Sequence, residues 1–387
     1  MKNLRQKFAA IIVLLGSSII ANATTYTVDN KDGSGAIYTV IQDAINAASP
    51  GDTLIIAGSE TDYAGFTLNK KLVIIGAGYN PSGKAQFAFP TSINSTITLR
   101  RQSDVQNLNA SGSYIEGIKF GGAGSQLNLG VDSDDTLKNI TIVKCYLGMD
   151  RIIVDDIYGL LLYNNIVHSF IQINNNTSTD QTSTSWDVVR NIAFFNNIFI
   201  AESYSWSLTT SGASASGYIV SNNIFTAPDN TFKVFSNGPT KNVVFTNNII
   251  YGMKAGDSRS DCDFCTLTNN LIYSDQSVSM NFSGTSSIGN NIENVDPKFT
   301  DASAFAFDYA YDYRLQDGSP AKGAGTDGTE IGIYGGPYPF PIGGESPYIT
   351  SPAPQLPSIS EYNIETAAVP SGGSIDINFK ANISNNQ

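Results

Sequence analysis

The sequence predicts an all-β solenoid, in which short strands stack coil upon coil around one apolar interior. Two observations carry this prediction. The doublet Asn-Asn followed by an apolar residue occurs six times between residues 164 and 291, at intervals of 32, 26, 25, 22 and 21 residues. Around the doublets, β-branched and aromatic residues alternate with polar ones at a period of two, the pattern of strands. A repeat of this length buries its apolar face only by stacking on its neighbours.

Each doublet is expected to form a corner between two strands. The doublets lie at residues 164–165, 196–197, 222–223, 247–248, 269–270 and 290–291. Asn adopts left-handed backbone more readily than other non-glycine residues, so a strand, one such residue and a second strand make a sharp turn. Stacked coils lie about 4.8 Å apart, where side-chain amides can hydrogen-bond in a ladder. Residues 114–120 and 140–147 fit the same frame without the doublet, which predicts that Cys145 is a buried thiol.

Residues 1–23 have the features of a secretory signal. Lys2, Arg5 and Lys7 precede an apolar run over residues 8–20, and Ala-Asn-Ala at 21–23 is a small-x-small cleavage site. This run is shorter than the roughly 20 residues that a membrane span needs. We therefore expect a secreted, periplasmic or bacterial cell-surface protein with no transmembrane segment in the mature chain.

The charge balance disfavours polyanionic partners such as nucleic acid. The 387 residues carry a formal net charge of −12. Removal of residues 1–23 with their three basic side chains would leave −15. Nucleic acid or an anionic membrane is recognised by Lys and Arg that replace counterions, and those residues are sparse here.

An amphipathic helix is predicted before the first coil, over residues 37–48. One stripe of this segment holds apolar residues: Val40, Ile41, Ala44, Ile45 and Ala48. Strands are predicted at residues 53–57 and 72–76. A helix in this position would cover the open end of the solenoid, which otherwise invites strand pairing with another molecule.

The two ends of the repeat region carry a family resemblance. The segments concerned are residues 38–48, 50–54 (Pro-Gly-Asp-Thr-Leu) and 72–78 at the entry, and 295–299 (Val-Asp-Pro-Lys-Phe), 312–321 and 332–336 at the exit. Together they resemble the caps of secreted right-handed parallel β-helix proteins of the pectate-lyase-like superfamily. The resemblance implies a single-stranded right-handed parallel β-helix of about ten coils over residues 24–342. That superfamily includes lyases, hydrolases, epimerases and adhesins, so function must be argued from a site.

The composition changes after residue 336. Seven of the 15 prolines fall between Pro337 and Pro357, which predicts a stiff, extended connector. Residues 375–383 alternate strictly and are expected to form a strand. We interpret residues 343–387 as a Pro-rich linker and a C-terminal strand tail that packs along the β-helix or against a neighbour, with an adhesion module or sorting signal as alternatives.

A third strand in each coil would place polar residues on an outer face. Aligning apolar residues inward gives one outward row: Asn128, Ile153, Gln172, Ser207, Lys233, Lys254 and Ser279. Lys233 and Lys254 then become neighbours on adjacent coils. Two ammonium groups held so close repel each other unless an anion or carboxylates lie between them. A sugar carboxylate would fit there.

The resemblance suggests a chemistry for this row. In polysaccharide lyases of the superfamily, the outer face of that row carries the cleft, where Lys or Arg abstracts the proton alpha to a uronate carboxylate that Ca²⁺ or a cation neutralises. The corresponding candidates are Lys254 as base with Lys233 and Arg259 as neutralisers. The hypothetical Ca²⁺ ligands are the hard oxygens of Asp257, Asp261 and Asp263. The expected partner is an extracellular polysaccharide.

The sequence leaves open whether the protein is an enzyme. Lysines on an exposed strand are commonly only solvated, and no complete lyase motif is present. Hydrolases of this fold cluster three Asp on adjacent strands, whereas the outward rows here supply only Asp155 with Asp156 beside it. The alternative to a calcium-assisted lyase is therefore a non-catalytic glycan-binding or surface-adhesion β-helix.

Three residues are candidate substrate contacts: Gln172, Tyr204 and Trp206. Tyr204 and Trp206, with Phe170 and Phe235 on nearby coils, could form aromatic platforms for sugar rings. Interior stacking is the alternative for the same side chains.

Histidine and cysteine limit the remaining chemistry. His168 is the single histidine, which excludes a histidine-based triad and a multi-histidine metal site. Cys262 and Cys265 in a secreted chain could close a small disulfide loop.

Overall fold

The structure, a computed structural model, describes most of the chain between residues 23 and 382. The described residues are 23–80, 89–101, 109–131, 136–174, 191–201, 206–211, 217–235, 238–256, 260–280, 282, 284, 286–302, 304–340, 358–364 and 377–382. The predicted signal, residues 1–23, lies almost wholly outside them. No helix in the described ranges is long and apolar enough to cross a membrane.

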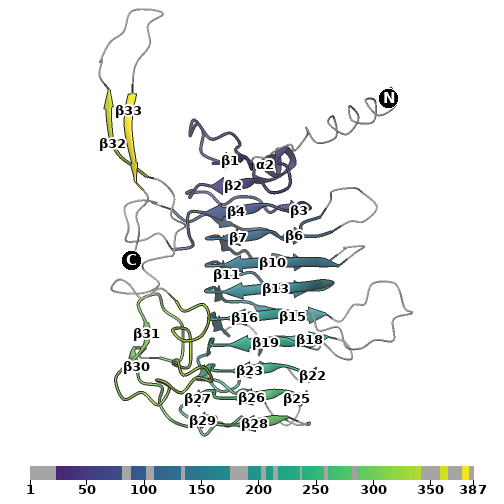
Figure 1. Ribbon diagram of the computed structural model, residues 1–387, viewed down its shortest axis with the longest axis vertical. Coiled ribbons are helices and arrows are strands. Elements are labelled where there is room, and N and C mark those ends of the chain that lie inside the picture. Colours follow the sequence, from purple (N-terminus) through teal and green to yellow (C-terminus); the bar gives the residue numbers. More distant parts are fainter. Residues whose placement is uncertain are drawn as a thin grey trace, which may run out of the picture.

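The chain is a parallel β-helix, as the sequence predicts. Strands of successive coils stack along one axis and form three long parallel sheets (Figure 1). Sheet A, with 11 strands, contains β1 (Thr25–Val28), β2 (Thr53–Ile56), β4 (Val73–Gly76), β7 (Tyr114–Glu116), β10 (Leu137–Val143), β13 (Ile157–Tyr163), β16 (Ile192–Phe195), β19 (Tyr218–Ser221), β23 (Val244–Thr246), β26 (Thr266–Thr268) and β28 (Ser287–Gly289). This number agrees with the prediction of about ten coils.

Sheets B and C complete each coil. Sheet B contains β5 (Ser92–Ile93), β8 (Lys119–Phe120), β11 (Tyr146–Leu147), β14 (Ile166–Val167), β17 (Ile198–Ile200), β20 (Ile224–Thr226), β24 (Ile249–Tyr251), β27 (Leu271–Tyr273) and β29 (Ile292–Glu293). Sheet C contains β3 (Thr67–Leu68), β6 (Ile97–Leu99), β9 (Gln126–Leu129), β12 (Arg151–Val154), β15 (Phe170–Asn174), β18 (Trp206–Ser211) and β21 (Lys233–Phe235). A short parallel pair, β22 (Gly238–Lys241) and β25 (Ser260–Asp263), lies near β18.

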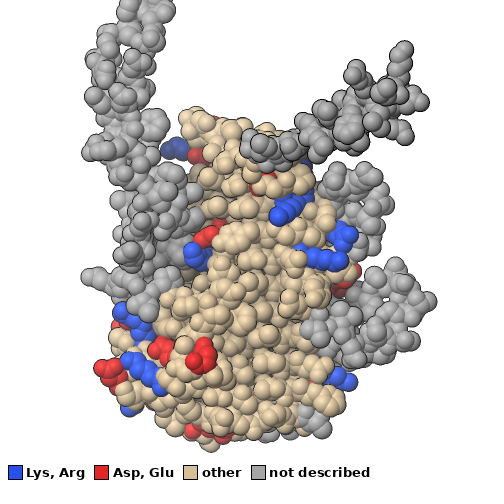
Figure 2. Space-filling view, in the orientation of Figure 1, with Lys and Arg blue, Asp and Glu red and all other residues tan. Residues whose placement is uncertain are grey.

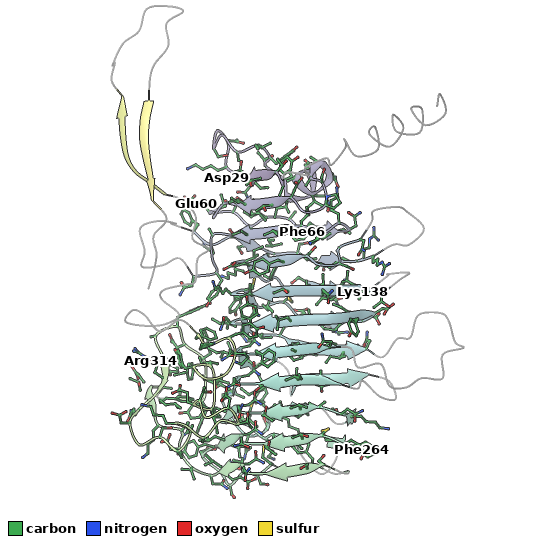
Figure 3. All side chains as sticks on the ribbon, in the orientation of Figure 1. Asp29, Glu60, Phe66, Lys138, Phe264 and Arg314 are labelled. Carbon is green, nitrogen blue, oxygen red and sulfur yellow. A yellow bond between two sulfur atoms is a disulfide. The ribbon has the colours of Figure 1, made fainter. Side chains whose placement is uncertain are left out.

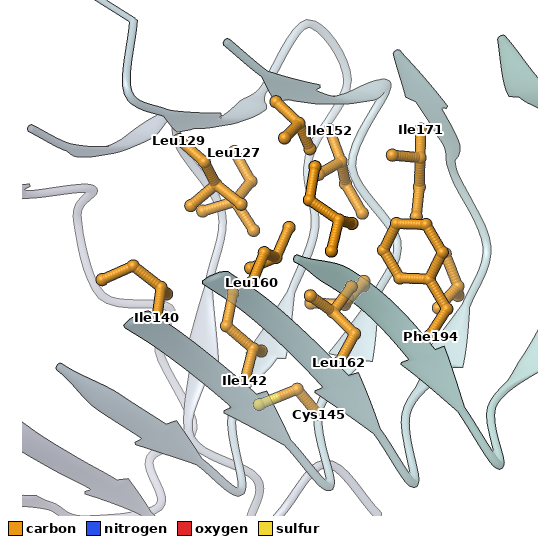
Figure 4. Close-up of a cluster of buried hydrophobic side chains, with 14 of the residues drawn as sticks. Leu127, Leu129, Ile140, Ile142, Cys145, Ile152, Leu160, Leu162, Ile171 and Phe194 are labelled. Atoms are coloured by element: carbon orange, nitrogen blue, oxygen red, sulfur yellow. The ribbon is translucent and has the colours of Figure 1, made fainter. Parts of the chain in front are cut away.

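Aliphatic side chains from all three sheets fill the interior. Leu127 and Ile152 of sheet C meet Ile142 and Leu162 of sheet A, and each is fully buried (Figure 4). Because side chains alternate along a strand, each coil contributes its inward residues to the same core. Cys145 is also fully buried, which confirms its predicted position.

The second Asn of each doublet forms the predicted interior ladder. These ladder asparagines are Asn165, Asn197, Asn223, Asn248, Asn270 and Asn291. The Nδ2 of each of the first five donates to the Oδ1 of the next ladder asparagine, at 3.0 to 3.1 Å. The same Oδ1 accepts from the backbone N–H of the preceding ladder asparagine, at 2.8 to 3.0 Å. The ladder therefore satisfies polar groups that would otherwise be buried without partners.

The first Asn of each doublet makes the corner and also holds a distant segment. These corner asparagines are Asn164, Asn196, Asn222, Asn247, Asn269 and Asn290, all with φ between 52° and 59°. Residues 324–340, the C-terminal strap, run back along five of them. Asn164 Nδ2 donates to the carbonyl of Tyr338 at 2.8 Å, and Asn269 Nδ2 donates to that of Ala324 at 3.0 Å.

The strap and the strands before it cover the outer face of sheet B. β30 (Phe299–Asp301) pairs antiparallel with β31 (Asp312–Leu315) beside that sheet (Figure 1). The resulting second core joins Ile166, Ile198, Ile224, Ile249 and Leu271 of sheet B and its edges to Phe299, Tyr313, Leu315, Ile331, Ile333 and Phe340. Tyr338 and Phe340, near the start of the Pro-rich segment, pack on the solenoid, inside the range 24–342 that the sequence assigns to the β-helix.

The helix α2 (Ile41–Ala47) is shorter than the predicted segment 37–48. Ile41, Ala44 and Ile45 are buried against the first coil as expected, but Val40 precedes the helix and is 44% exposed. Lys70 Nζ donates to the carbonyl of Ala48, just after the helix, at 2.8 Å and to that of Asn46, in its last turn, at 3.2 Å.

The C-terminal tail contains a strand within the predicted range, and this strand pairs with a second one that the sequence did not predict. β33 (Ile377–Asn382) pairs antiparallel with β32 (Ser358–Ile364). In the part of the chain that the structure describes, these two strands form a sheet of their own.

Candidate functional site

The outer face of sheet C carries the predicted polar row, with one change of register. Asn128, Ile153 and Gln172 pair in sequence across β9, β12 and β15, as predicted. Gln172 then pairs with Thr209, not with Ser207. A shift of two residues keeps the same face outward, so the alternation of apolar residues could not distinguish the two alignments.

The centre of this face is a contact network around Arg151. Its guanidinium carbon lies 5.2 Å from the centre of the Phe170 ring, a cation–π geometry. Arg151 Nη1 donates to Oε1 of Gln172 at 3.3 Å, and Gln172 Nε2 donates to Oδ1 of Asn174 at 2.8 Å. Gln172 is half-buried, and these two bonds hold it between Arg151 and Asn174. The arrangement presents fixed donors and acceptors of the kind that bind hydroxyl and carboxylate groups.

Lys233 and Lys254 are neighbours on adjacent coils, as predicted. The two residues form a parallel bridge at the end of sheet C. The Val234 N–H donates to the carbonyl of Lys254 at 2.9 Å, and the Lys254 N–H donates to that of Phe232 at 3.0 Å. Both lysines are half-buried, and Lys254 lies between the buried Met253 and Ala255.

The lysine pair is displaced along the strands from the row of Gln172. Lys233 pairs with Trp206, whereas Gln172 pairs with Thr209. Three residues separate these two positions of β18, or about 10 Å along the strand. The prediction of one continuous row from Asn128 to Ser279 was therefore wrong. The Arg151 network and the lysine pair are two separate groups, and the odd offset of three residues does not keep them on one face of the strand.

Most of the predicted metal loop lies outside the described residues. This applies to Asp257 and Arg259 and to the side chain of Asp261. Asp263 is half-buried in β25, where it pairs with Lys241. Among the described side chains, no three His, Cys, Asp or Glu lie close enough together to hold a metal ion. Because the described loop supplies a single carboxylate, we derive no step through calcium.

Cys262 and Cys265 form a disulfide, one of the states that the sequence left open. Their Cα atoms are 5.7 Å apart, and both residues are 1% exposed. The disulfide closes the turn between β25 and β26 at the corner where the chain passes into sheet A.

The aromatic residues divide between the two expected roles. Phe235 is 3% exposed and packs against Phe245 in the interior, with ring centres 5.3 Å apart. Phe170 lies under Arg151. Trp206 is placed in β18 opposite Lys233, without a described side chain, and Tyr204 lies outside the described residues.

His168 contacts a tyrosine on the outer face of sheet B. Its Nδ1 lies 2.9 Å from the hydroxyl oxygen of Tyr146. This position is away from sheet C, so His168 takes no part in the candidate site.

A charged cluster on sheet A was missed from the sequence. The Glu116 carboxylate accepts hydrogen bonds from Tyr114 at 2.6 Å and from Lys144 at 2.9 Å. Burial and the neighbouring Glu116 raise the pKa of Tyr114 far above its usual range. Figure 2 shows that Lys, Arg, Asp and Glu otherwise gather at the edges of this face. Because Tyr114, Glu116 and Lys144 come from two coils, only their stacking brings them together.

Comparisons with known proteins identify no family and give only a weak structural likeness. No protein-family model and no curated protein matches the chain. Among solved structures, the alginate lyase from Paenibacillus sp. str. FPU-7 is similar at 15% sequence identity and a TM-score of 0.36, over 66% of this chain and 96% of that one. A likeness of this size carries no argument about activity. The chain itself is a parallel β-helix with a polar outer face on sheet C.

Proposed function

We propose that this protein is an extracellular polysaccharide-binding β-helix that engages an acidic glycan along the outer face of sheet C and cleaves it by β-elimination. The observation that supports this most is the bridge between Lys233 and Lys254. It sets two cationic side chains in register on adjacent coils, in a chain with a net charge of −12. A uronate carboxylate is an anion that such a pair can bind.

The lysines have separate roles in the proposed reaction. Lys254 takes the proton alpha to the uronate carboxylate, and the electron pair of that C–H bond forms a carbon–carbon double bond. The bond to the glycosidic oxygen breaks, and that oxygen leaves with a proton from Lys254 or water. Lys233 and Arg259 neutralise the carboxylate while negative charge builds up on it, which lowers the barrier.

The Arg151 network, in which Gln172 lies two strands of sheet C before Lys233, is proposed as a second binding subsite. Gln172 and Asn174 present amide groups that can bind sugar hydroxyls, and Tyr204 and Trp206 remain proposed sugar contacts. Asp257, Asp261 and Asp263 remain proposed calcium ligands, because carboxylate oxygens are the donors that Ca²⁺ prefers.

Ultraviolet absorbance of the unsaturated product tests the proposal. Wild type, Lys254→Ala and Lys233→Ala are assayed on alginate, pectate, chondroitin and heparan, with calcium or with a chelator. Lys138→Ala is the matched control, since Lys138 is an exposed lysine on β10 of sheet A (Figure 3). We expect absorbance to grow for wild type and the control, and to fall at least about 100-fold for Lys254→Ala. A flat trace for wild type on every substrate would refute the lyase.

A second candidate is a glycan-binding or adhesion protein without catalysis. It is favoured by the separate hairpin of β32 and β33, which pairs with no strand of the three long sheets in the described part of the chain. Retardation of wild type in gels containing these glycans, without growth of absorbance, would select this function.

A further inference from the structure

Phe264 combines two unfavourable properties at one position. It is 71% exposed, the highest value among the large hydrophobic side chains that the structure describes. Its backbone is left-handed, with φ at 57°. In that conformation the Cβ of an ordinary residue crowds the following carbonyl oxygen, so the position is strained for Phe.

The preceding coils have Asn or Gly at the position that Phe264 occupies. The strand registers align Phe264 with the equivalent residues of five earlier coils. These residues are Asn139, Gly159, Asn191, Gly217 and Asn242, all with positive φ. Asn and Gly are the residues that tolerate left-handed backbone. Phe264 is therefore the exception in a row whose backbone favours Asn or Gly.

Covalent and hydrogen-bonded contacts fix the backbone on both sides of Phe264. The buried disulfide joins Cys262 to Cys265 across it. The Asp263 carbonyl accepts from the Asn242 N–H at 3.0 Å, and the Ser286 hydroxyl donates to the Cys262 carbonyl. The turn that carries the exposed ring is therefore fixed. Less conformational entropy of this turn is lost when a ligand binds.

Exposed apolar side chains on the preceding coils continue the same edge. Ile219 and Val244 pair across β19 and β23, and each is 37% exposed. Val244 pairs in turn with Thr266, two residues after Phe264. Figure 3 shows Phe264 at the corner beside sheet A, at the same end of the solenoid as β22 and β25.

We infer that Phe264 is a sugar-stacking platform at the corner between β25 and sheet A. This inference rests on the proposed polysaccharide binding and adds a specific contact to it. The faces of sugar rings present C–H groups, which pack on the face of an aromatic ring. An exposed aromatic residue on a fixed, strained turn fits that role. Solubility and stability alone favour Asn, as at Asn242 in the preceding coil.

Affinity electrophoresis in gels with sodium alginate or sodium polygalacturonate tests the inference, together with thermal unfolding. Phe264→Asn is expected to bind at least about fivefold more weakly than wild type. Its Tm is expected to rise by about 2 °C, because the strain is relieved. Phe264→Trp should keep the binding. Phe89→Asn, which removes another exposed aromatic side chain at 38% exposure, is the control and should bind like wild type.

The outcomes separate this inference from the proposed function. Equal binding by wild type and Phe264→Asn would overturn the role of Phe264 and leave the sheet C proposal standing. An unchanged or lower Tm for Phe264→Asn would refute the strain. Binding of neither glycan by wild type would overturn both, while weaker binding by Phe264→Asn with full binding by Phe89→Asn supports both.

Discussion

The interior ladder makes a quantitative prediction for Asn223→Ala. The Asn223 Oδ1 accepts from the Asn197 N–H at 2.8 Å, and its Nδ2 donates to the Phe194 carbonyl at 2.9 Å. Truncation removes both of these bonds and leaves the buried Asn197 N–H without its acceptor. An orphaned buried donor costs about 1 to 3 kcal/mol and a lost hydrogen bond about 1 kcal/mol, so the two together cost about 3 kcal/mol. The free energy of unfolding, from guanidinium titration followed by circular dichroism, should fall by that amount.

Asn291→Ala is the matched control for this prediction. Asn291 is the last ladder residue and makes the same contacts, with its Oδ1 accepting from the Asn270 N–H at 2.9 Å and its Nδ2 donating to the Leu267 carbonyl at 2.8 Å. It is only half-buried, so water can replace the lost amide. We expect a loss of about 1 kcal/mol. Equal losses for the two variants, or less than about 1 kcal/mol for Asn223→Ala, would refute the reasoning from burial.

Two further predictions concern titratable groups. Burial raises the pKa of the Cys145 thiol to about 12, so iodoacetamide should label it only after unfolding, as measured by mass spectrometry, and rapid labelling of the folded protein would contradict this. Burial also raises the pKa of Glu330 above its ordinary 4.5, against a smaller lowering by Lys322. The protonated form is therefore favoured in the folded state, and its stability contribution is lost as pH rises through the folded pKa. Glu330→Gln should raise Tm at neutral pH and leave it unchanged well below pH 4.5, and a pH-independent difference would count against it.

The sequence by itself determined the corners, the ladder and the neighbouring lysines. Left-handed backbone is a local preference of Asn, and a recurring doublet puts the same amide at the same depth in every coil. Lys233 and Lys254 became neighbours because the interval of 21 residues equals one coil with no long insert. These features depend on local conformation and on the length of the repeat, and both can be read from the sequence.

Tertiary structure alone decided the register of β18, the Glu116 cluster and the position of the C-terminal strap. The pairing of Gln172 with Thr209 instead of Ser207 preserves the inward pattern, so only the packed neighbours select it. The strap bonds Tyr338 to Asn164, residues separated by 174 positions. No periodic signal marks such a contact. It forms because sheet B has an apolar outer face that must be covered, and because the corner asparagines still have amide protons to donate.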